Sequence, residues 1–371
     1  MKVCLDLRTS AGPMHGIARY GGELARALSG LRHLPPLLIL AGRKGIPDPP
    51  DGTAFRLLRS AVRPYGLLEQ FWIPCLIART EADLYHCVTY GCPALVSQPF
   101  LFTLHDLIPL MQRREHGLAK RIYFQVIVRC ALRRCRKLLV VSEYTRSCLI
   151  RWAPDCSDKI RVVLPAGDHI LRTSISPADE LRFLAINPEK RPFFLSVANA
   201  RPHKNIRLAL RAFSCLARES ADGPIYILVG PQHPQVHAYA AVSGVGDRIR
   251  FAGEVSDGLL RLLYQRALAL VFPAMGEGFG LPIVEAMQFG LPVLAADGGA
   301  SPEVLGGTGF ILSCDHVREW EEALSKVRTE RLRERWDPSP VLDRARVFTW
   351  ERVARETLGV YGEATEHAGA P

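Results

Sequence analysis

Apolar residues gather into short runs along this chain, and the runs alternate with longer stretches of helical spacing. The runs at 3–7, 84–88 and 100–104 have the length of buried strands. After the first run and a Gly-rich turn, residues 18–28 show the pattern of an amphipathic helix. Repeated alternation of this kind predicts an α/β fold with parallel sheets.

Two such series follow one another. Further strands are expected at 36–41, 137–142, 160–164, 192–198, 226–229, 249–252, 269–272 and 292–295. A polar stretch joins the two series and contains Pro177 and Pro188. We therefore expect two Rossmann-like domains that face one another, over residues 1–170 and 191–347, with an interdomain connection over 171–190. With 371 residues and 48% hydrophobic residues, the chain has material for two cores and is not a disordered protein.

The net charge of +10 is concentrated in one segment. Residues 112–151 hold eleven Lys and Arg against Glu115 and Glu143, and the rest of the chain is nearly neutral. Within 117–137 a helix is expected, with one apolar face and one basic face. The apolar face comprises Leu118, Ile122, Val126 and Ala131, and the basic face comprises Arg129, Arg133, Arg136 and Lys137. This face is either an ordinary solvated surface or a contact with anionic lipid.

Nucleic-acid binding is a weaker interpretation of the same charge, because no recognition motif or interleaved aromatic residues accompany the cations. The ten cysteines form no C-x-x-C pair, which fits a reducing compartment better than a disulfide scaffold. No apolar stretch approaches the roughly 18 residues of a membrane-spanning helix. A cytoplasmic protein is expected.

The densest motif runs from Phe272 to Val293 and reads strand, Gly-rich turn, helix, turn and strand. Gly278 and Gly280 allow backbone amides to approach a ligand closely. Glu277 and Glu285 are eight positions apart, about 12 Å along a helix, and can hold two parts of one extended ligand. In isolation, the same pair is better explained as a first-turn charge and a solvated helix residue, and the surrounding Gly-Phe-Gly-Leu-Pro and Glu-Ala-Met residues reverse that preference.

The motif E-G-F-G-L-P-x-x-E-A-M-x-x-G-x-P-V, followed by Ala-Ser-Pro-Glu-Val at 300–304, resembles the donor site of family 4 glycosyltransferases. These are retaining enzymes of the GT-B fold that use nucleotide sugars. The resemblance covers nearly the whole chain through weaker motifs in the same order. These are Gly-Ile-Ala-Arg-Tyr at 16–20, Leu-His-Asp-Leu-Ile-Pro at 104–109, Val-Ser-Glu-Tyr-Thr-Arg at 141–146, Arg-Pro-His-Lys at 201–204 and Arg-Phe-Ala-Gly-Glu-Val at 250–255.

The resemblance implies a role for each matching residue. Arg201 and Lys204 would bind the diphosphate leaving group, which gains negative charge as the glycosidic bond breaks. Glu285 would bind the ribose, and Glu277 the donor-sugar hydroxyls. The remaining donor-binding residues would be Gly16, Gly278, Phe279, Gly280, Leu281, Gly253 and Glu254, with Gly16 closing over the diphosphate and the last two near the base. His105 would approach the donor sugar, and a helix over 348–364 would return to the first domain.

The motifs offer no second carboxylate for a double displacement, because Asp106, beside His105, is expected to point elsewhere. The resemblance therefore implies a front-face transfer, in which the departing phosphate oxygen helps deprotonate the acceptor. No D-x-D motif occurs in the chain, so we expect transfer without a metal and without another cofactor.

Two motifs, Leu-His-Asp-Leu-Ile-Pro and Gly-Ile-Ala-Arg-Tyr, resemble those of bacterial polysaccharide and lipopolysaccharide mannosyltransferases that use GDP-mannose. A UDP-sugar is the alternative donor. The expected acceptor is a saccharide linked to polyisoprenyl diphosphate, at the inner face of the cytoplasmic membrane. A GT-B epimerase or a non-catalytic sugar-nucleotide binder remains open, since fold does not fix function. A dinucleotide-dependent oxidoreductase is disfavoured, because the turn at 10–17 lacks G-x-G-x-x-G spacing.

Overall fold

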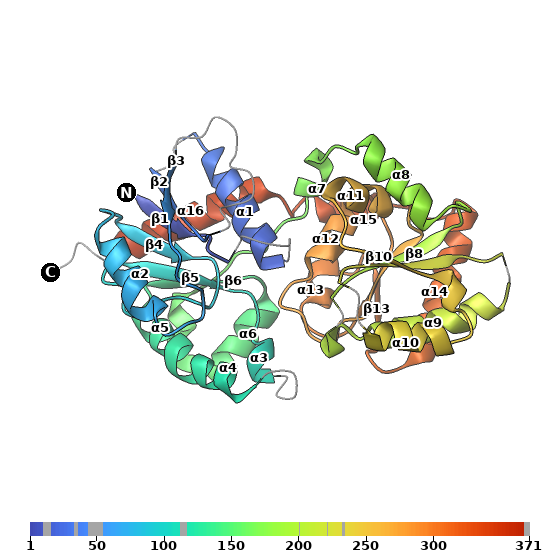
Figure 1. The fold of residues 1–371 in the computed structure, drawn as a ribbon, viewed down its shortest axis with the longest axis horizontal. Helices are drawn as coiled ribbons and strands as arrows, with labels where there is room; N and C mark the ends of the chain where they lie inside the picture. The colour runs from blue at the N-terminus through green and yellow to red at the C-terminus, as the bar shows by residue number, and fades with distance from the viewer. Residues whose placement is uncertain are drawn as a thin grey trace. The chain divides into compact units, whose positions relative to one another are not determined.

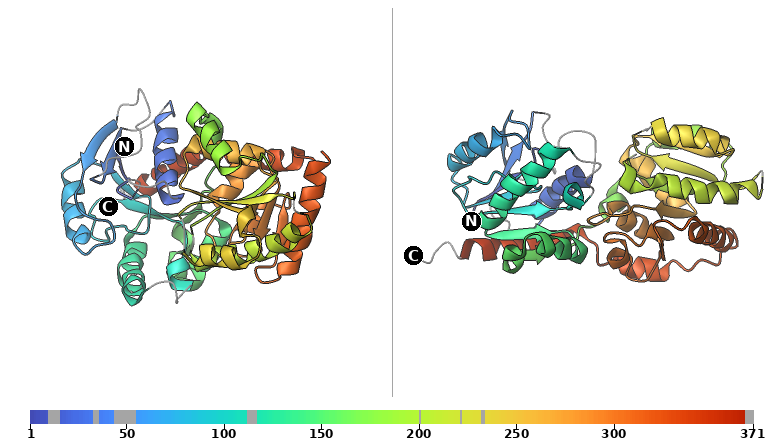
Figure 2. Two further views of the ribbon diagram at one scale, coloured as in Figure 1. Left: turned by 45° about the vertical axis from the view of Figure 1, so that its right-hand side comes forward. Right: turned by 90° about the horizontal axis from the view of Figure 1, so that it is seen from below.

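The structure, a computed structural model, describes residues 1–9, 16–32, 36–43, 55–111, 117–199, 201–220, 222–231 and 234–366. Contacts divide the chain into two compact units (Figure 1). Unit 1 comprises Met1–Pro165 and Thr349–Pro371, and unit 2 comprises Ala166–Phe348. Each unit is built on a parallel β-sheet flanked by helices, which confirms the predicted α/β class (Figure 2).

The sheet of unit 1 has the strand order β3-β2-β1-β4-β5-β6-β7. Its strands are β1 (Val3–Asp6), β2 (Leu37–Ala41), β3 (Phe55–Arg59), β4 (Leu84–Cys87), β5 (Phe100–Leu104), β6 (Lys137–Val140) and β7 (Ile160–Val162). All neighbouring strands pair in parallel. The inner strands are buried along their length, as their continuous apolar sequence predicts. The direction of winding reverses between β1 and β4.

Right-handed connections distribute the helices of unit 1 over the sheet. The helices are α1 (Gly16–Ser29), α2 (Glu69–Ala78), α3 (Ile108–Met111), α4 (Leu118–Tyr123), the π-turn η1 (Phe124–Val128), α5 (Arg129–Arg134), α6 (Glu143–Trp152), η2 (Pro154–Lys159) and α16 (Trp350–Glu366). Buried residues of α2, η1, α5 and α6 share one core cluster with the sheet. Helices α1 and α16 lie side by side (Figure 1).

Helix α16 brings the end of the chain back to unit 1, where it is tied to the sheet by a buried histidine. The ring of His86 contacts the Tyr361 hydroxyl at 2.7 Å and the Thr103 hydroxyl at 2.9 Å. Burial lowers the pKa of His86 to about 3, so this histidine is neutral in the fold. The helix expected over 348–364 is observed from Trp350 to Glu366.

The sheet of unit 2 has the order β10-β9-β8-β11-β12-β13. Its strands are β8 (Phe193–Val197), β9 (Ile225–Val229), β10 (Ile249–Gly253), β11 (Ala269–Phe272), β12 (Val293–Ala296) and β13 (Phe310–Leu312). Its helices are α7 (His169–Arg172), α8 (Pro177–Ile186), η3 (Pro202–Lys204), α9 (Ile206–Arg218), α10 (Pro234–Val242), η4 (Gly246–Arg248), α11 (Asp257–Arg266), α12 (Leu281–Met287), α13 (Ser301–Leu305), α14 (Val317–Leu332) and α15 (Ser339–Ala345). Winding reverses between β8 and β11, and ligands of open α/β sheets bind beyond the carboxyl ends of strands at such a point.

The polar stretch 171–190 is not a free connection between the two units. It lies within unit 2, which begins at Ala166, and it contains the second half of α7 and all of α8. Ser176 and Asp179 form a capping box at the start of α8, and Arg182 donates to the carbonyl oxygens of Ala252 and Glu254. The stretch is polar because α8 has an exposed face and capping residues.

Two strands and one helix face differ from the sequence prediction. Strands β3 and β13 were not expected: β3 mixes apolar and basic residues, β13 has only three residues, and both are partly exposed. The helical stretch 117–137 is divided by the π-turn η1, and its buried residues include Phe124, Val128 and Leu132. Of the four residues of the predicted apolar face, Ala131 is buried, whereas Leu118, Ile122 and Val126 are exposed. The exposed row and the buried row are both spaced by four residues. The spacing alone therefore does not show which side of the helix is buried; tertiary packing determines it.

Candidate active site

The loop between β11 and α12 carries the Gly-rich motif and is fixed by close backbone packing. A Cβ atom on Gly298 would lie 2.2 Å from the Met275 carbonyl oxygen, and one on Gly299 would lie 2.4 Å from the Glu277 amide nitrogen. The Ala300 amide donates to the Glu277 carbonyl oxygen at 3.0 Å. Only glycine allows this approach, so the turn after β12 holds the backbone of Glu277 in place.

The same loop ends at a second constrained glycine. Gly280 has φ of +98°, a conformation that favours glycine, and it immediately precedes α12. Pro282 lies in the first turn of the helix, where a missing amide hydrogen costs little. Gly278, Phe279 and Leu281 are therefore held within one short, defined turn.

Residues 201–204 form the turn that follows β8, beside the loop that follows β11. The two segments are bonded directly, because the Met275 amide donates to the His203 carbonyl oxygen at 2.8 Å. Asn205 ends the turn with φ of +52°, and its side chain donates to the Cys314 carbonyl oxygen. The Arg201 side chain is exposed next to this turn. The strand order thus brings two sequence motifs, separated by some seventy residues, to one edge of the sheet.

Glu277 and Lys204 form an ion pair at this edge. The Lys204 Nζ lies 2.8 Å from Oε1 of Glu277, and the His203 Nε2 lies 3.3 Å from the same oxygen. Burial raises the pKa of the Glu277 carboxyl, but the charge of Lys204 and the bonds from Lys204 and His203 outweigh it and lower the pKa to about 2. Glu277 is therefore ionised at neutral pH, within a mostly enclosed cluster of charge.

Glu285 lies on α12 and is 5% exposed, so it is not the solvated helix residue of the alternative interpretation. Its Oε2 accepts from the Tyr264 hydroxyl at 2.8 Å, and its Oε1 lies 3.1 Å from Nε2 of His169. A Cβ atom on Gly167 would lie 2.6 Å from the Val284 carbonyl carbon, so the segment before α7 packs against α12. A carboxylate accepts up to about four hydrogen bonds, so these contacts are compatible with a further bond to a hydroxyl-rich ligand.

The carboxyl end of β10 lies next to β9 in the same sheet. Gly253 has φ of +68°, and its carbonyl oxygen accepts from the Gly230 amide at 2.9 Å. Glu254 is exposed, and its backbone is held by Arg182. The structure therefore places Gly253 and Glu254 at the sheet edge where β8 and β11 also end, two strands away from β8 and three from β11.

Two predicted residues belong to unit 1. His105 follows β5, and its Nε2 lies 2.8 Å from the carbonyl oxygen of Val88, which follows β4. A carbonyl oxygen only accepts, so this nitrogen carries the proton. The ring also packs edge-on against Tyr20 of α1, the helix that begins at Gly16. Asp106 accepts from the Ile108 amide at the start of α3, which gives it a local capping contact.

Two family models match the chain in succession. The model described as Glycosyltransferase Family 4 matches residues 14–169, and the model described as Glycosyl transferases group 1 matches residues 178–339. Together they span most of both units, including every predicted site residue. The chain belongs to the group 1 glycosyltransferases of family 4.

This glycosyltransferase has curated and structural relatives of similar length. It is 27% identical to O-antigen chain mannosyltransferase B of Escherichia coli, over 97% of this chain and 99% of that protein. Its fold is similar to sucrose-phosphate synthase from Thermosynechococcus elongatus, with a TM-score of 0.79, 19% identity and full coverage of both chains. It is also similar to Anabaena HepE in complex with UDP and glucose, with a TM-score of 0.73, 18% identity and coverage of 98% and 99%. The GT-B fold predicted from the motifs is thereby confirmed.

Some features of this glycosyltransferase were not foreseen from its sequence. The carboxylate of Glu277 is contacted by His203, and that of Glu285 by His169 and Tyr264. No sequence spacing between these residues and the two glutamates indicates the contacts. The close backbone contact of Gly298 and Gly299 could have been predicted, since a Gly-Gly pair shortly after a strand often marks such an approach. Gly167 precedes the segment predicted as a connection and gave no such signal.

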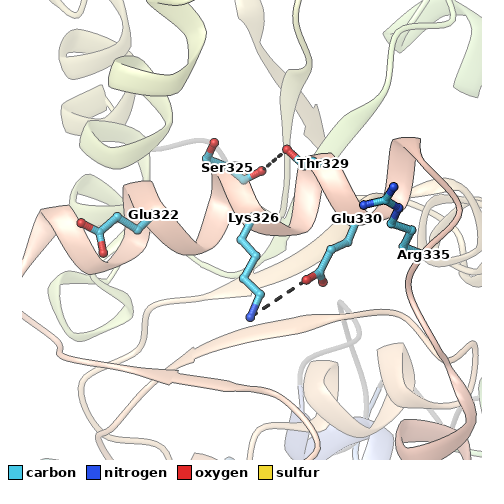
Figure 3. Close-up of a pocket in the computed structure, with 6 residues that line it drawn as sticks. All are labelled: Glu322, Ser325, Lys326, Thr329, Glu330 and Arg335. Atoms are coloured by element: carbon cyan, nitrogen blue, oxygen red, sulfur yellow. Dashed lines mark hydrogen bonds and ion pairs between the residues drawn. The ribbon is translucent and has the colours of Figure 1, made fainter.

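A hollow of about 510 Å³ on unit 2 lies away from these motifs. It is lined along α14 and the segment after it by Glu322, Ser325, Lys326, Thr329, Glu330 and Arg335 (Figure 3). The Nζ of Lys326 lies 4.0 Å from Oε1 of Glu330, and the Thr329 hydroxyl donates to the Ser325 carbonyl oxygen. Each of these contacts joins neighbouring turns of α14. These contacts are ordinary surface pairs, and we assign the hollow no part in the chemistry.

Over the part of the chain that the structure describes, no three His, Cys, Asp or Glu side chains are grouped as a metal site would require. Nor does any helix among those residues have both the length and the apolar character needed to cross a membrane.

Proposed function

We propose that this glycosyltransferase moves a mannosyl group from GDP-mannose to a lipid-linked saccharide, with retention of configuration, in cell-surface polysaccharide synthesis. The observation that carries the proposal is the buried cluster of Glu277, Lys204 and His203 where β8 and β11 end. Such a cluster offers both a carboxylate for sugar hydroxyls and a cation for a phosphate. The mannosyl choice is supported by the name of the Escherichia coli relative.

In this proposal Arg201 and Lys204 bind the donor diphosphate. An ammonium group has three donors, so Lys204 can keep its bond to Glu277 while it donates to a phosphate oxygen. The carboxylate of Glu277 then accepts from donor-sugar hydroxyls, together with the backbone of the turn Gly278–Leu281. Because the cluster is fixed before the donor arrives, it stabilises the growing charge of the leaving group without reorganisation.

The nucleoside is bound by the neighbouring strand ends. Glu285, held by His169 and Tyr264, accepts from the ribose hydroxyls, and Gly253 with Glu254 lies near the base. In unit 1, His105 approaches the donor sugar, and Gly16 closes over the diphosphate. The last two roles rest on family resemblance and on the local positions of His105 and Gly16.

Retention would follow a front-face route, because the proposed residues supply no nucleophile. Glu277 is paired with Lys204, and Asp106 is occupied at the start of α3. As the C–O bond to the diphosphate breaks, the departing phosphate oxygen accepts the proton of the attacking acceptor hydroxyl. Arg201 and Lys204 take the role that a metal has elsewhere, so EDTA is expected to leave the rate unchanged. A loss of rate on chelation that Mn²⁺ restores would contradict this.

A UDP-sugar is the alternative donor, as the UDP complex of the Anabaena structure suggests by fold alone. A thermal-shift panel of GDP-mannose, UDP-glucose and UDP-galactose tests the choice, because a ligand that binds only the folded state raises the melting temperature. GDP-mannose is expected to raise it most. An epimerase or a binding protein is distinguished by nucleotide release, which only a transferase increases when acceptor is added.

We further propose that the enzyme works at the anionic inner face of the membrane through the basic segment 112–151, of which 112–116 lies outside the described residues. Within the described part, Lys137 pairs with Glu363 at 2.7 Å and Arg146 pairs with Glu143, so these two cations are engaged within the protein. Arg133, Arg134 and Arg136 are exposed and lie at the end of α5 or just after it. If co-sedimentation with vesicles does not depend on their content of anionic lipid, the proposed membrane contact is wrong.

A further inference from the structure

The amino-terminal end of α2 exposes large apolar side chains in an unusual concentration. Leu67, Leu68, Phe71 and Trp72 are 74%, 76%, 67% and 59% exposed. The opposite side of the same helix packs into the core through residues such as Ile73. Scattered apolar residues are normal on a protein surface, but four within six positions form a patch that requires a partner.

A second exposed apolar row lies on the neighbouring helix. Leu118, Ile122 and Val126 are spaced by four along α4 and η1 and are 69%, 53% and 57% exposed. The sequence pattern predicts these residues as part of the apolar face of a helix. Their exposure leaves a continuous stripe along two turns of helix that the described residues of unit 1 do not cover.

The two rows belong to one layer of unit 1. Helices α2, η1 and α5 pack onto the same core cluster, so their outward sides all face away from that side of the sheet. The helices are joined directly, because the Tyr123 hydroxyl of α4 donates to Glu69 of α2 at 2.9 Å and the rings of Tyr65 and Tyr123 are 6.3 Å apart. We call the seven exposed residues of the two rows the apolar surface.

Within the two segments that carry the apolar surface, the charges that are not buried are of one sign. The segment 117–136 contains six Lys and Arg and no acidic residue, and the segment 70–80 also has no acidic residue. The acidic residue at the start of α2, Glu69, is fully buried, with Oε2 3.4 Å from the guanidinium of the buried Arg8. At the end of α5, Arg133 and Arg134 are exposed beyond the apolar row.

We infer that the apolar surface inserts into the interfacial region of an anionic membrane, with Phe71 and Trp72 as its aromatic anchors. Apolar side chains flanked by cations and free of acids match the boundary between acyl chains and anionic headgroups. A second copy of the chain is a poorer partner, because a two-fold contact would bring the same cations together. The inference rests on the membrane contact proposed above and adds the residues that insert.

The test compares vesicles of phosphatidylcholine with vesicles that also contain phosphatidylglycerol. The full chain is expected to co-sediment with the anionic vesicles, and Phe71→Ser with Trp72→Ser is expected to lower this partitioning at least tenfold. Arg133→Glu with Arg134→Glu should lower it on anionic vesicles. Leu181→Ser, which removes a 69% exposed leucine from α8 of unit 2, serves as the matched control and should change nothing.

A spectroscopic readout separates insertion from general adsorption. Anionic vesicles should shift the tryptophan emission of the wild type to shorter wavelength, and Trp72→Phe should lose most of that shift while it still binds. Wild-type protein that ignores anionic vesicles would overturn both the membrane proposal and the inference. If the Arg variant loses binding but Phe71→Ser with Trp72→Ser binds normally, only the inference is overturned. The inference is also overturned if Phe71→Ser with Trp72→Ser leaves vesicle binding unchanged but eliminates a self-association that light scattering detects in the wild type.

Discussion

Two regions of the molecule reverse the usual distribution of side chains in opposite ways. In unit 2, charged and polar groups are enclosed where β8 and β11 end: Glu277 with Lys204, and Glu285 with His169. In unit 1, the outer side of α2 and α4 exposes leucine, phenylalanine and tryptophan to solvent. Both arrangements have a cost for the isolated protein, because buried charge must be desolvated and exposed apolar surface must be hydrated.

The comparison shows what each region requires from a partner. The enclosed charges are already paired with one another, so a donor would enter a cluster whose geometry is set. The apolar surface is not covered by the residues of unit 1 that the structure describes, so it is available to an external surface. The first region is expected to determine the reaction, and the second to determine where it takes place.

The largest effect is expected from the Glu277 carboxylate. Glu277→Gln removes the charge that pairs with Lys204 while keeping the shape, and it should lower kcat by about a thousandfold. The initial rate of acceptor-dependent nucleotide release measures it. The melting temperature and the affinity for free GDP serve as controls, since Gln should leave the fold and the nucleotide site intact. Full activity of this variant would contradict the role assigned to Glu277.

A second, smaller effect should come from His169, which acts on the site through Glu285. His169→Ala should raise the KM for the donor about tenfold with little change in kcat, because a loosened Glu285 weakens ribose binding uniformly. His169→Gln places an amide nitrogen near the original Nε2 and should restore most of the affinity. If His169→Ala and Glu285→Gln have fully additive effects on the Kd for GDP, the two residues do not act together, and the interpretation is wrong.

How far the sequence predicts these regions depends on the kind of contact. The Gly-rich loop and the two motif glutamates could be found, because glycine positions and fixed spacings are local. The partners His203, His169 and Tyr264 could not, because the sheet order places them there and no spacing reveals it. The exposure of the apolar row on α4 and η1 could not be predicted for a related reason: helical periodicity gives two candidate faces, and only packing determines which one is buried.

An intermediate effect should separate the two regions. Phe71→Ser with Trp72→Ser should lower the rate on an acceptor embedded in anionic vesicles about fivefold, through weaker partitioning. The same variant should keep its rate within about twofold on an acceptor dissolved in detergent, because neither substituted residue has a part in the proposed donor site. Radiolabelled sugar transfer measures both rates. Equal losses on the two acceptors would show that the patch acts on the reaction and not on location.

The smallest effect concerns the buried neutral histidine of unit 1. Because burial lowers the pKa of His86 to about 3, the unfolded chain binds a proton below pH 6.5 that the folded chain does not. The free energy of unfolding should therefore fall as the pH drops, by about 1 kcal/mol at pH 5.5 from this group. Urea unfolding at pH 7 and pH 5.5 measures the loss. In His86→Gln that part of the pH dependence should vanish, and an unchanged slope would argue against a neutral, buried His86.

The most direct test of the central claim is the release of GDP from GDP-mannose, measured with and without a lipid-linked saccharide acceptor, for the wild type and for Glu277→Gln. We expect release that depends on the acceptor, continues in EDTA, yields a product with the anomeric configuration of the donor, and nearly disappears in the variant. Release at the same rate without acceptor, or with Gln at position 277, would contradict it.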